Sequence, residues 1–469
     1  MAVQVLLGLV LIANAQEPSA PSEKPKPAGR SVPAVSDAAT QEANNGEDPL
    51  AKWNPDTMPI TGLQSPTIGN QGFRHSYLVP GLQFGSMIQD QPPGSGSSQG
   101  WYANNFLGAN LSLSKDWSRS QLLLNYSVGG LITNGPGQNN GWYQQLAFSQ
   151  NFNWRRWQMQ ILDQFSYLPE TQFGFGAGTG LASPGISGPL GPSVPGIGGS
   201  VSPNQSAFAS VGPQYNNSFV TQVTYQTSRR GSITVGGSVG LLRFTEAGNI
   251  DSNNYIGNIG YNYLLSKVDS FGFFYRFQAY HYDGNPQAIG DHVLNFVYGR
   301  KIAKSLALQI TGGPDITNYR VPLGTQGRTT SGSGGISLIY ALQRGSVSAS
   351  YFHGITSGSG ILTGSNTDQV AFSGTRQLGR VWNVRSNVGF SKNRQLSSGA
   401  IPSSDFDSIF AGGGLSRPIG RNFDWSLAYQ AQIQKQNTNN CIGSLCNTSN
   451  TQNVVTINLQ WHSRPFVLE

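Results

Sequence analysis

The chain has 469 residues, of which only 11% are charged and 60 are glycine. A soluble domain of average composition carries about a quarter charged residues, so the composition argues against an ordinary soluble protein. Downstream of the N-terminus there is also no run of about 18 apolar residues that could form a membrane-spanning helix. Low charge without such a helix fits one large β-barrel, whose outward face meets lipid and whose inward face is polar.

The N-terminal region predicts export. Val3–Ile12 is a short apolar run, and Ala13-Asn14-Ala15 is a small-x-small cleavage site, so residues 1–15 read as a signal peptide cleaved before Gln16. Met1–Gln4 contains no Lys or Arg, which departs from the usual signal, and a buried N-terminal strand is the alternative. Residues 16–74 are rich in Pro, Ala, Ser and Glu without periodicity and are predicted to be a disordered periplasmic linker. A docking role for this linker is the alternative.

Residues 75–469 are predicted to form the barrel. In Asn422–Gln434, apolar and aromatic residues occupy alternate positions and polar residues the others, which gives a β-strand one apolar face and one polar face. About eighteen segments have this pattern and predict an all-β, antiparallel, up-and-down transmembrane barrel. Sixteen strands is the alternative if the first hairpin lies outside the wall. The predicted strands are Ser76–Gln89, Asn105–Ser114, Gln121–Ile132, Trp142–Gln150, Trp157–Tyr167, Ser218–Thr227, Gly231–Arg243, Tyr255–Leu264, Phe271–His281, His292–Arg300, Leu306–Thr317, Gly335–Leu342, Ser346–His353, Gln369–Leu378, Val381–Lys392, Asp407–Leu415, Phe423–Gln434 and Val454–His462.

One strand breaks the pattern. In Trp157–Tyr167, Asp163 shares the apolar face, where a carboxylate at mid-depth in lipid would be costly. Two interpretations are open: a β-bulge shifts the register, or the assignment of the faces is wrong.

Positive charge is concentrated in the tight turns, which recur about once per hairpin. They hold 15 of the 29 Lys and Arg residues. Outer-membrane barrels have short periplasmic turns and longer external loops, so these turns are assigned to the periplasm. A ring of cations there suits an anionic phospholipid surface. It does not indicate nucleic-acid binding, because no basic patch is interleaved with stacking aromatic residues. The basic turn residues are Lys115, Arg119, Arg155, Arg156, Arg229, Arg230, Lys267, Arg300, Lys301, Lys304, Arg344, Arg376, Arg380, Arg417 and Arg421.

The pattern over about Tyr77–Phe466 resembles a bacterial outer-membrane β-barrel of the porin-like kind, without pointing to a subfamily. The alternating Val455, Ile457, Leu459 and Trp461 resemble the C-terminal signal read by the barrel-assembly machinery, although Phe466 is followed by three further residues. The resemblance implies that the protein lies in the outer membrane of a bacterial cell, where it contacts lipid and the barrel-assembly machinery. It also allows a homo-oligomer.

The predicted lumen wall is rich in Gln, Asn, Ser and Thr, which suits uncharged hydrophilic solutes, although any wet lumen must be polar. Arg276 and Arg385 fall near mid-strand on the inward face; together with Asp424 and Gln430 they are the candidates for a constriction, and Asp424 is a possible carboxylate partner for the arginines. Pro169–Asn216 is the third external loop, and porins fold this loop into the channel. A mobile external loop is the alternative.

Two close cysteines, Cys441 and Cys446, predict a local disulfide in an exported protein rather than a metal site. No cofactor is indicated. The nearest approach to a catalytic cluster is Asp291-His292 or His281-Tyr282-Asp283, and neither has the spacing of a triad, so an enzyme is not predicted.

Three functions remain open. The first is a channel for passive diffusion of small hydrophilic solutes. The second is a barrel component of polysaccharide export or surface assembly, in which residues 16–70 dock a partner. The third is a structural barrel with a blocked lumen.

Overall fold

A computed structural model describes residues 76–468, except 91–100, 135–139, 169–213, 229, 246–249, 267, 284–287, 304, 321–325, 360–361, 380, 397–403 and 439–446. The predicted signal peptide, the linker, most of the third external loop and both cysteines lie outside the described residues. Among the described residues, no helix is long and apolar enough to cross a membrane.

The described chain contains 19 β-strands. They are β1 Tyr77–Asp90, β2 Trp101–Asp116, β3 Ser120–Thr133, β4 Gly141–Asn153, β5 Trp157–Leu168, β6 Gln214–Gln226, β7 Gly231–Phe244, β8 Ser252–Leu264, β9 Asp269–Tyr282, β10 Ala288–Ala303, β11 Leu306–Arg320, β12 Gln326–Leu342, β13 Gly345–Ser359, β14 Leu362–Leu378, β15 Trp382–Gln395, β16 Ser404–Ile419, β17 Phe423–Thr438, β18 Asn447–His462 and β19 Phe466–Val467.

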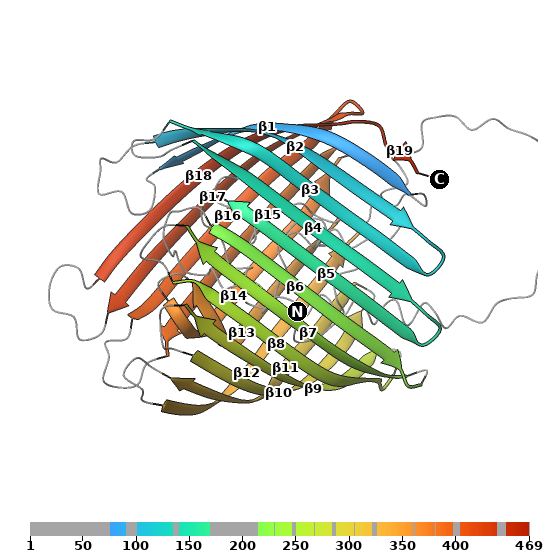
Figure 1. Cartoon of the computed structure of the whole chain (residues 1–469), viewed down its shortest axis with the longest axis vertical. Coiled ribbons are helices and arrows are strands. Elements are labelled where there is room, and N and C mark those ends of the chain that lie inside the picture. The colour runs from blue at the N-terminus through green and yellow to red at the C-terminus, as the bar shows by residue number, and fades with distance from the viewer. Residues whose placement is uncertain are drawn as a thin grey trace, which may run out of the picture.

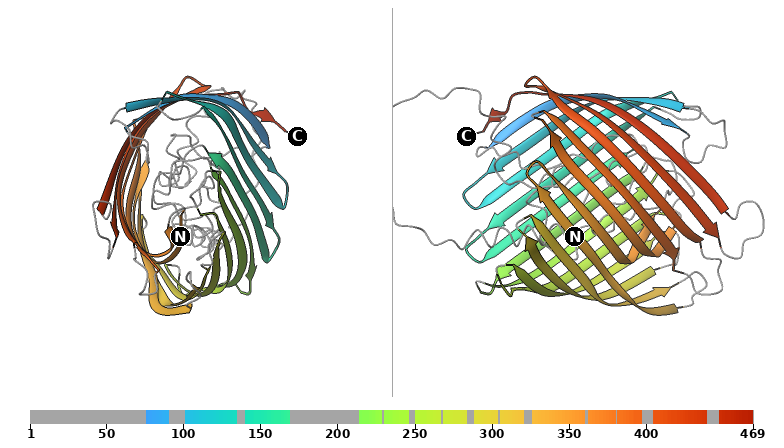
Figure 2. Two further views of the ribbon diagram at one scale, coloured as in Figure 1. Left: turned by 60° about the vertical axis from the view of Figure 1, so that its left-hand side comes forward. Right: turned by 180° about the vertical axis from the view of Figure 1, so that it is seen from behind.

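Each long strand pairs antiparallel with the next, and β1 pairs with β18, so the sheet closes on itself (Figures 1 and 2). The all-β, closed antiparallel barrel is confirmed. The strand number is corrected to 19, because β19 resumes the ladder after Pro465 and pairs with Tyr77 and Leu78. The sixteen-strand alternative is wrong, because the first hairpin forms part of the wall.

The alternation of side chains fixes the two faces of the wall. In β17, Tyr429 and Ile433 are exposed on the outward face, whereas Gln430, Gln432 and Gln434 are buried on the inward face. This is the arrangement predicted for Asn422–Gln434. Burying polar groups on one face and exposing large apolar groups on the other is the opposite of a soluble protein, and it matches a barrel whose solvent outside is lipid.

Aromatic side chains on the inward face lie over glycines of neighbouring strands. Phe274 of β9 lies directly opposite Gly260 of β8, and a Cβ atom added at Gly260 would come within 1.8 Å of its ring. One added at Gly108 would come within 1.9 Å of the hydroxyl of Tyr143. Tyr143 reaches over β3 and β2 to Gln83 of β1, whose amide nitrogen lies 2.5 Å from the tyrosine hydroxyl oxygen. Glycine in these strands therefore makes room for the rings that pack the inner wall.

The two rims differ as predicted from the turns. Alternate strands are joined by tight turns at one rim, whereas the opposite rim carries the longer connections, apart from the two residues that join β13 to β14. Cross-strand contacts hold basic residues at the tight-turn rim. Arg417 lies 5.1 Å from the ring centre of Trp382, and the guanidinium of Arg300 lies 3.8 Å from a carboxylate oxygen of Asp269.

Asp163 stays on the outward face, because the pairing of β5 with β4 and with β6 runs without a bulge. Neither a β-bulge nor a wrong assignment of the faces, the two interpretations left open by the sequence, is therefore found. The carboxylate is half-buried and accepts a hydrogen bond of 3.2 Å from the amide nitrogen of Asn217 on β6. A neighbouring polar side chain therefore offsets part of the cost of placing this group on the outward face.

Candidate functional site

The inner wall of the barrel is the candidate functional surface. It is formed by the inward faces of β1–β18 and is mostly amide and hydroxyl. Asparagines on four strands stand out, because both side-chain polar atoms of each are buried and have no hydrogen-bond partner in the described protein. They are Asn104, Asn151, Asn258 and Asn387. Buried polar atoms are normally satisfied, and leaving one unsatisfied costs roughly 1–3 kcal/mol.

The four residues predicted to line a constriction all lie on the inward face but are not gathered in one place. Gln430 is buried near the middle of β17, opposite Gly412 of β16. Arg385 on β15 is half-buried and lies against Gly414 of β16. Asp424 lies at the tight-turn end of β17, where a carboxylate oxygen is 3.6 Å from Nε2 of His462. The suggested partnership of Asp424 with the arginines stays a prediction.

Arg276 belongs to a polar cluster on β9, β10 and β11, which we call the β9–β11 cluster: Arg276, Gln278, Asp291, Asp315 and Thr317. The register of the three strands places Gln278, Asp291 and Thr317 in one row across the wall, and Arg276 and Asp315 in the next row, on either side of Val293. The cluster was missed from the sequence, because its members come from three strands and only register brings them together.

The contacts inside the cluster are short. The amide nitrogen of Gln278 donates to Asp291 at 2.5 Å. The hydroxyl of Thr317 lies 3.0 Å from Asp291 and 3.1 Å from Asp315, and its single proton can serve only one carboxylate at a time. Arg276 lies close enough to Asp315 to interact electrostatically. Both aspartates are 0% exposed, so the cluster buries two carboxylates with one guanidinium.

The candidate catalytic pair Asp291-His292 is separated by the wall. Asp291 faces inward, whereas His292 faces outward, where its Nδ1 lies 2.8 Å from the hydroxyl of Tyr275. Adjacent strand residues point to opposite faces, so these two side chains cannot act together. Within the part of the chain that the structure describes, no group of three or more His, Cys, Asp or Glu side chains is arranged to hold a metal ion.

A patch of apolar side chains lies directly above the β9–β11 cluster, toward the rim with the longer connections. Tyr280, Tyr282 and Ile289 form a buried group with Ile355 of β13, and Tyr319 and Leu396 pack against it. The group thus joins the inward face of β9 and β10 to the end of the β13–β14 hairpin. No feature of the sequence signalled this contact.

A closed antiparallel barrel with a lipid-type outward face and a polar inward face is an outer-membrane-type β-barrel, the form in which bacterial outer-membrane proteins span their membrane. No protein-family model matches the chain, and no curated protein matches it.

Solved structures with a similar course of the chain include a porin, an outer membrane protein and an iron transporter. OpdQ of Pseudomonas aeruginosa is 10% identical, with a TM-score of 0.42 over 84% of this chain and 100% of that one. A BenF-like porin from Pseudomonas fluorescens Pf-5 is 7% identical, with a TM-score of 0.42 over 83% and 99%. The FrpB iron transporter of Neisseria meningitidis (F5-1 variant) is 7% identical, with a TM-score of 0.41 over 83% of each chain. At these TM-scores, a function must be argued from the barrel itself.

Proposed function

We propose that the protein spans the outer membrane and is a channel through which small hydrophilic solutes diffuse passively. The observation that carries the proposal is the set of four buried asparagines on the inner wall whose side-chain amides have no hydrogen-bond partner in the described protein. In a dry or tightly filled lumen these groups would stay unsatisfied, whereas small rotations would bring them to water or to the hydroxyl groups of a solute. This favours a wet channel over a structural barrel with a blocked lumen.

The number of strands supports the same function. Barrels of 16–18 strands are wide enough to hold an aqueous channel, whereas eight-stranded barrels are filled by their own side chains. Most of the wall is uncharged, which suits uncharged solutes such as sugars and predicts weak ion selectivity. The β9–β11 cluster is the exception.

The test is single-channel conductance of the purified, refolded full-length protein in a planar bilayer. We expect steady conductance steps with weak selectivity between potassium and chloride ions. A correctly folded protein that gives no conductance steps would contradict the proposal. The same preparation without residues 16–70 provides a control, because a diffusion channel should keep its conductance, whereas loss of a co-purifying partner would favour the export or assembly function.

A further inference from the structure

The β13–β14 hairpin leaves the barrel wall at its outer end. The ladder between β12 and β13 stops at the pair Gly334–His353, although β12 continues to pair with β11 as far as Gln326. Beyond His353, β13 pairs only with β14, up to Ser359. The wall therefore forks between β12 and β13, and the far end of the hairpin is free to take a different direction from its neighbour.

The burial of Ile355 shows which direction it takes. Val347 and Tyr351 are exposed on the outward face of β13, and Ile355 follows at the same alternation. Ile355 is nevertheless only 5% exposed and lies in a group with Tyr280 and Ile289, which belong to the inward face of β9 and β10. An outward face can meet an inward face only if the hairpin has folded over into the mouth of the barrel.

Contacts at the other side of the hairpin end confirm the position. A Cβ atom added at Gly364 would come within 2.1 Å of Cδ1 of Ile289, so the two residues touch. Gly364 has a φ of +73°, a left-handed conformation that glycine adopts without strain. A side chain at this position would be opposed by both the backbone and the contact.

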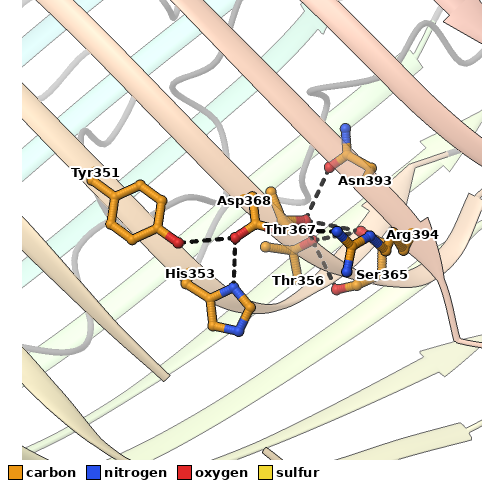
Figure 3. A network of polar contacts seen from close by, with 8 residues as sticks. All are labelled: Tyr351, His353, Thr356, Ser365, Thr367, Asp368, Asn393 and Arg394. Carbon is orange, nitrogen blue, oxygen red and sulfur yellow. Dashed lines mark hydrogen bonds and ion pairs between the residues drawn. The ribbon is translucent and has the colours of Figure 1, made fainter. Parts of the chain in front are cut away.

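A hydrogen-bond network at the bend holds the hairpin to β15 (Figure 3). The hydroxyl oxygens of Thr356 and Thr367 lie 2.8 Å apart, and Thr367 donates to Asn393 of β15 at 2.9 Å. On the opposite face, Asp368 accepts a hydrogen bond from Tyr351 at 3.0 Å and lies 2.7 Å from Nδ1 of His353.

Arg394 of β15 adds an ion pair to Asp368 at 3.9 Å, so both faces of the hairpin are tied to its neighbour. These contacts hold β13 and β14 against β15 up to the start of the hairpin end.

The polar groups directly beneath the hairpin end include two carboxylates for one guanidinium, and acceptor atoms among them are left without a hydrogen bond within the described residues. Oδ2 of Asp315 and Oε1 of Gln278 are buried and have no hydrogen-bond partner in the described protein. Gln278 is 0% exposed, and its unpartnered oxygen belongs to the same amide whose nitrogen donates to Asp291. An excess of acceptors is complementary to an N–H donor that carries positive charge.

We propose that the β13–β14 hairpin and the inward face of β9–β11 form the constriction of the channel, and that Asp291 and Asp315 give this constriction a preference for solutes bearing an ammonium group. The proposal rests on the proposed channel function and adds the place of the narrowing and a class of solute. The constriction then includes a hairpin of the wall, which the sequence did not single out.

The first test removes the hairpin end. Residues 355–366 are replaced by Asn-Gly, a two-residue turn that can join the paired residues Gly354 and Thr367. The expected result is a higher single-channel conductance than wild type. An unchanged conductance in a folded variant would overturn the constriction, whereas absence of conductance in the wild type would overturn the channel function itself.

If the shortened hairpin does not fold, a cross-link in the full-length protein tests the inward position of the hairpin instead. Ile355→Cys and Ile289→Cys are combined in a Cys441→Ser, Cys446→Ser background, and a short bis-maleimide is added to the protein in vesicles. Efficient joining of the two residues, read by gel mobility after proteolysis between them, is expected. Joining no better than in a Val347→Cys, Ile289→Cys control would overturn the inward position of the hairpin.

The second test concerns charge. The rates at which glucosamine and glucose enter proteoliposomes are measured from the swelling of the vesicles. Glucosamine carries an ammonium group at the carbon where glucose carries a hydroxyl. In Asp291→Asn, Asp315→Asn, the glucosamine-to-glucose rate ratio should fall at least about fourfold, because loss of a single unit charge acting through water over about 5 Å already has roughly that effect. Asp424→Asn, at the rim, is the matched control and should leave the ratio unchanged. An equal ratio in wild type and the double variant would overturn the ammonium preference while leaving the channel intact.

Discussion

Replacing Val388 with arginine is expected to lower the free energy of unfolding of the barrel by about 2–4 kcal/mol, the cost of an Arg on the lipid face near mid-depth. Val388 lies in the middle of β15 and is 51% exposed, next to Phe372 of β14 across the ladder. The outward exposure of both side chains is what the proposed contact with lipid predicts.

The measurement is reversible unfolding by guanidinium chloride in lipid vesicles. Val388→Leu provides the matched control, because it keeps an apolar group at the same depth and should change stability by less than about 1.5 kcal/mol. If arginine and leucine were equally stable at this position, the outward face of β15 would not be in contact with lipid, and the transmembrane arrangement would have to be abandoned.

Replacing Gly260 with valine is expected to destabilise the barrel by about 1–3 kcal/mol, the usual cost of forcing extra atoms into a packed site. The three atoms nearest to a Cβ at this position all belong to the ring of Phe274. The ring of Phe274 also covers Gly272, where a built Cβ atom would lie 2.8 Å from it. The substituted side chain and the ring therefore compete for one space.

A double-mutant cycle separates this competition from a general loss of backbone freedom. Phe274→Leu alone leaves a space and lowers stability, but in combination with Gly260→Val the two losses should partly cancel, with a coupling of roughly 0.5–3 kcal/mol. Strictly additive losses would mean that the glycine is needed for its backbone and not for the ring above it.

The strands could be predicted from the sequence wherever lipid imposes an alternation. Phe423–Gln434 was found because every second residue is apolar, and the structure extends it only to Thr438. By contrast, Gly335–Leu342 was predicted as a short strand, whereas β12 begins at Gln326. The missed residues are Gln, Gly, Arg, Thr and Ser. Over these residues the strand needs only backbone partners, so its side chains carry no periodic signal.

The candidate site could be predicted only in part. The inward position of Arg276 follows from alternation within β9 and was predicted. Its proximity to Asp315 depends on the registers of β9, β10 and β11, which are set by turn geometry and a bulge near Lys301 rather than by any local pattern. Sequence proximity was misleading for Asp291, which was considered with His292 although the two lie on opposite sides of the wall.

The two ends of the described chain meet at the tight-turn rim. The amide nitrogen of Leu468 donates to the carbonyl oxygen of Ser76 at 2.8 Å, and β19 pairs with the first residues of β1. The ring of strands therefore has no intrinsic starting point. A circular permutant, with the old ends joined and new ends opened at a tight turn such as that between β16 and β17, would keep every cross-strand pair except those at the new opening. The order in which the strands are synthesised is thus a matter of how the barrel assembles and not of which barrel results.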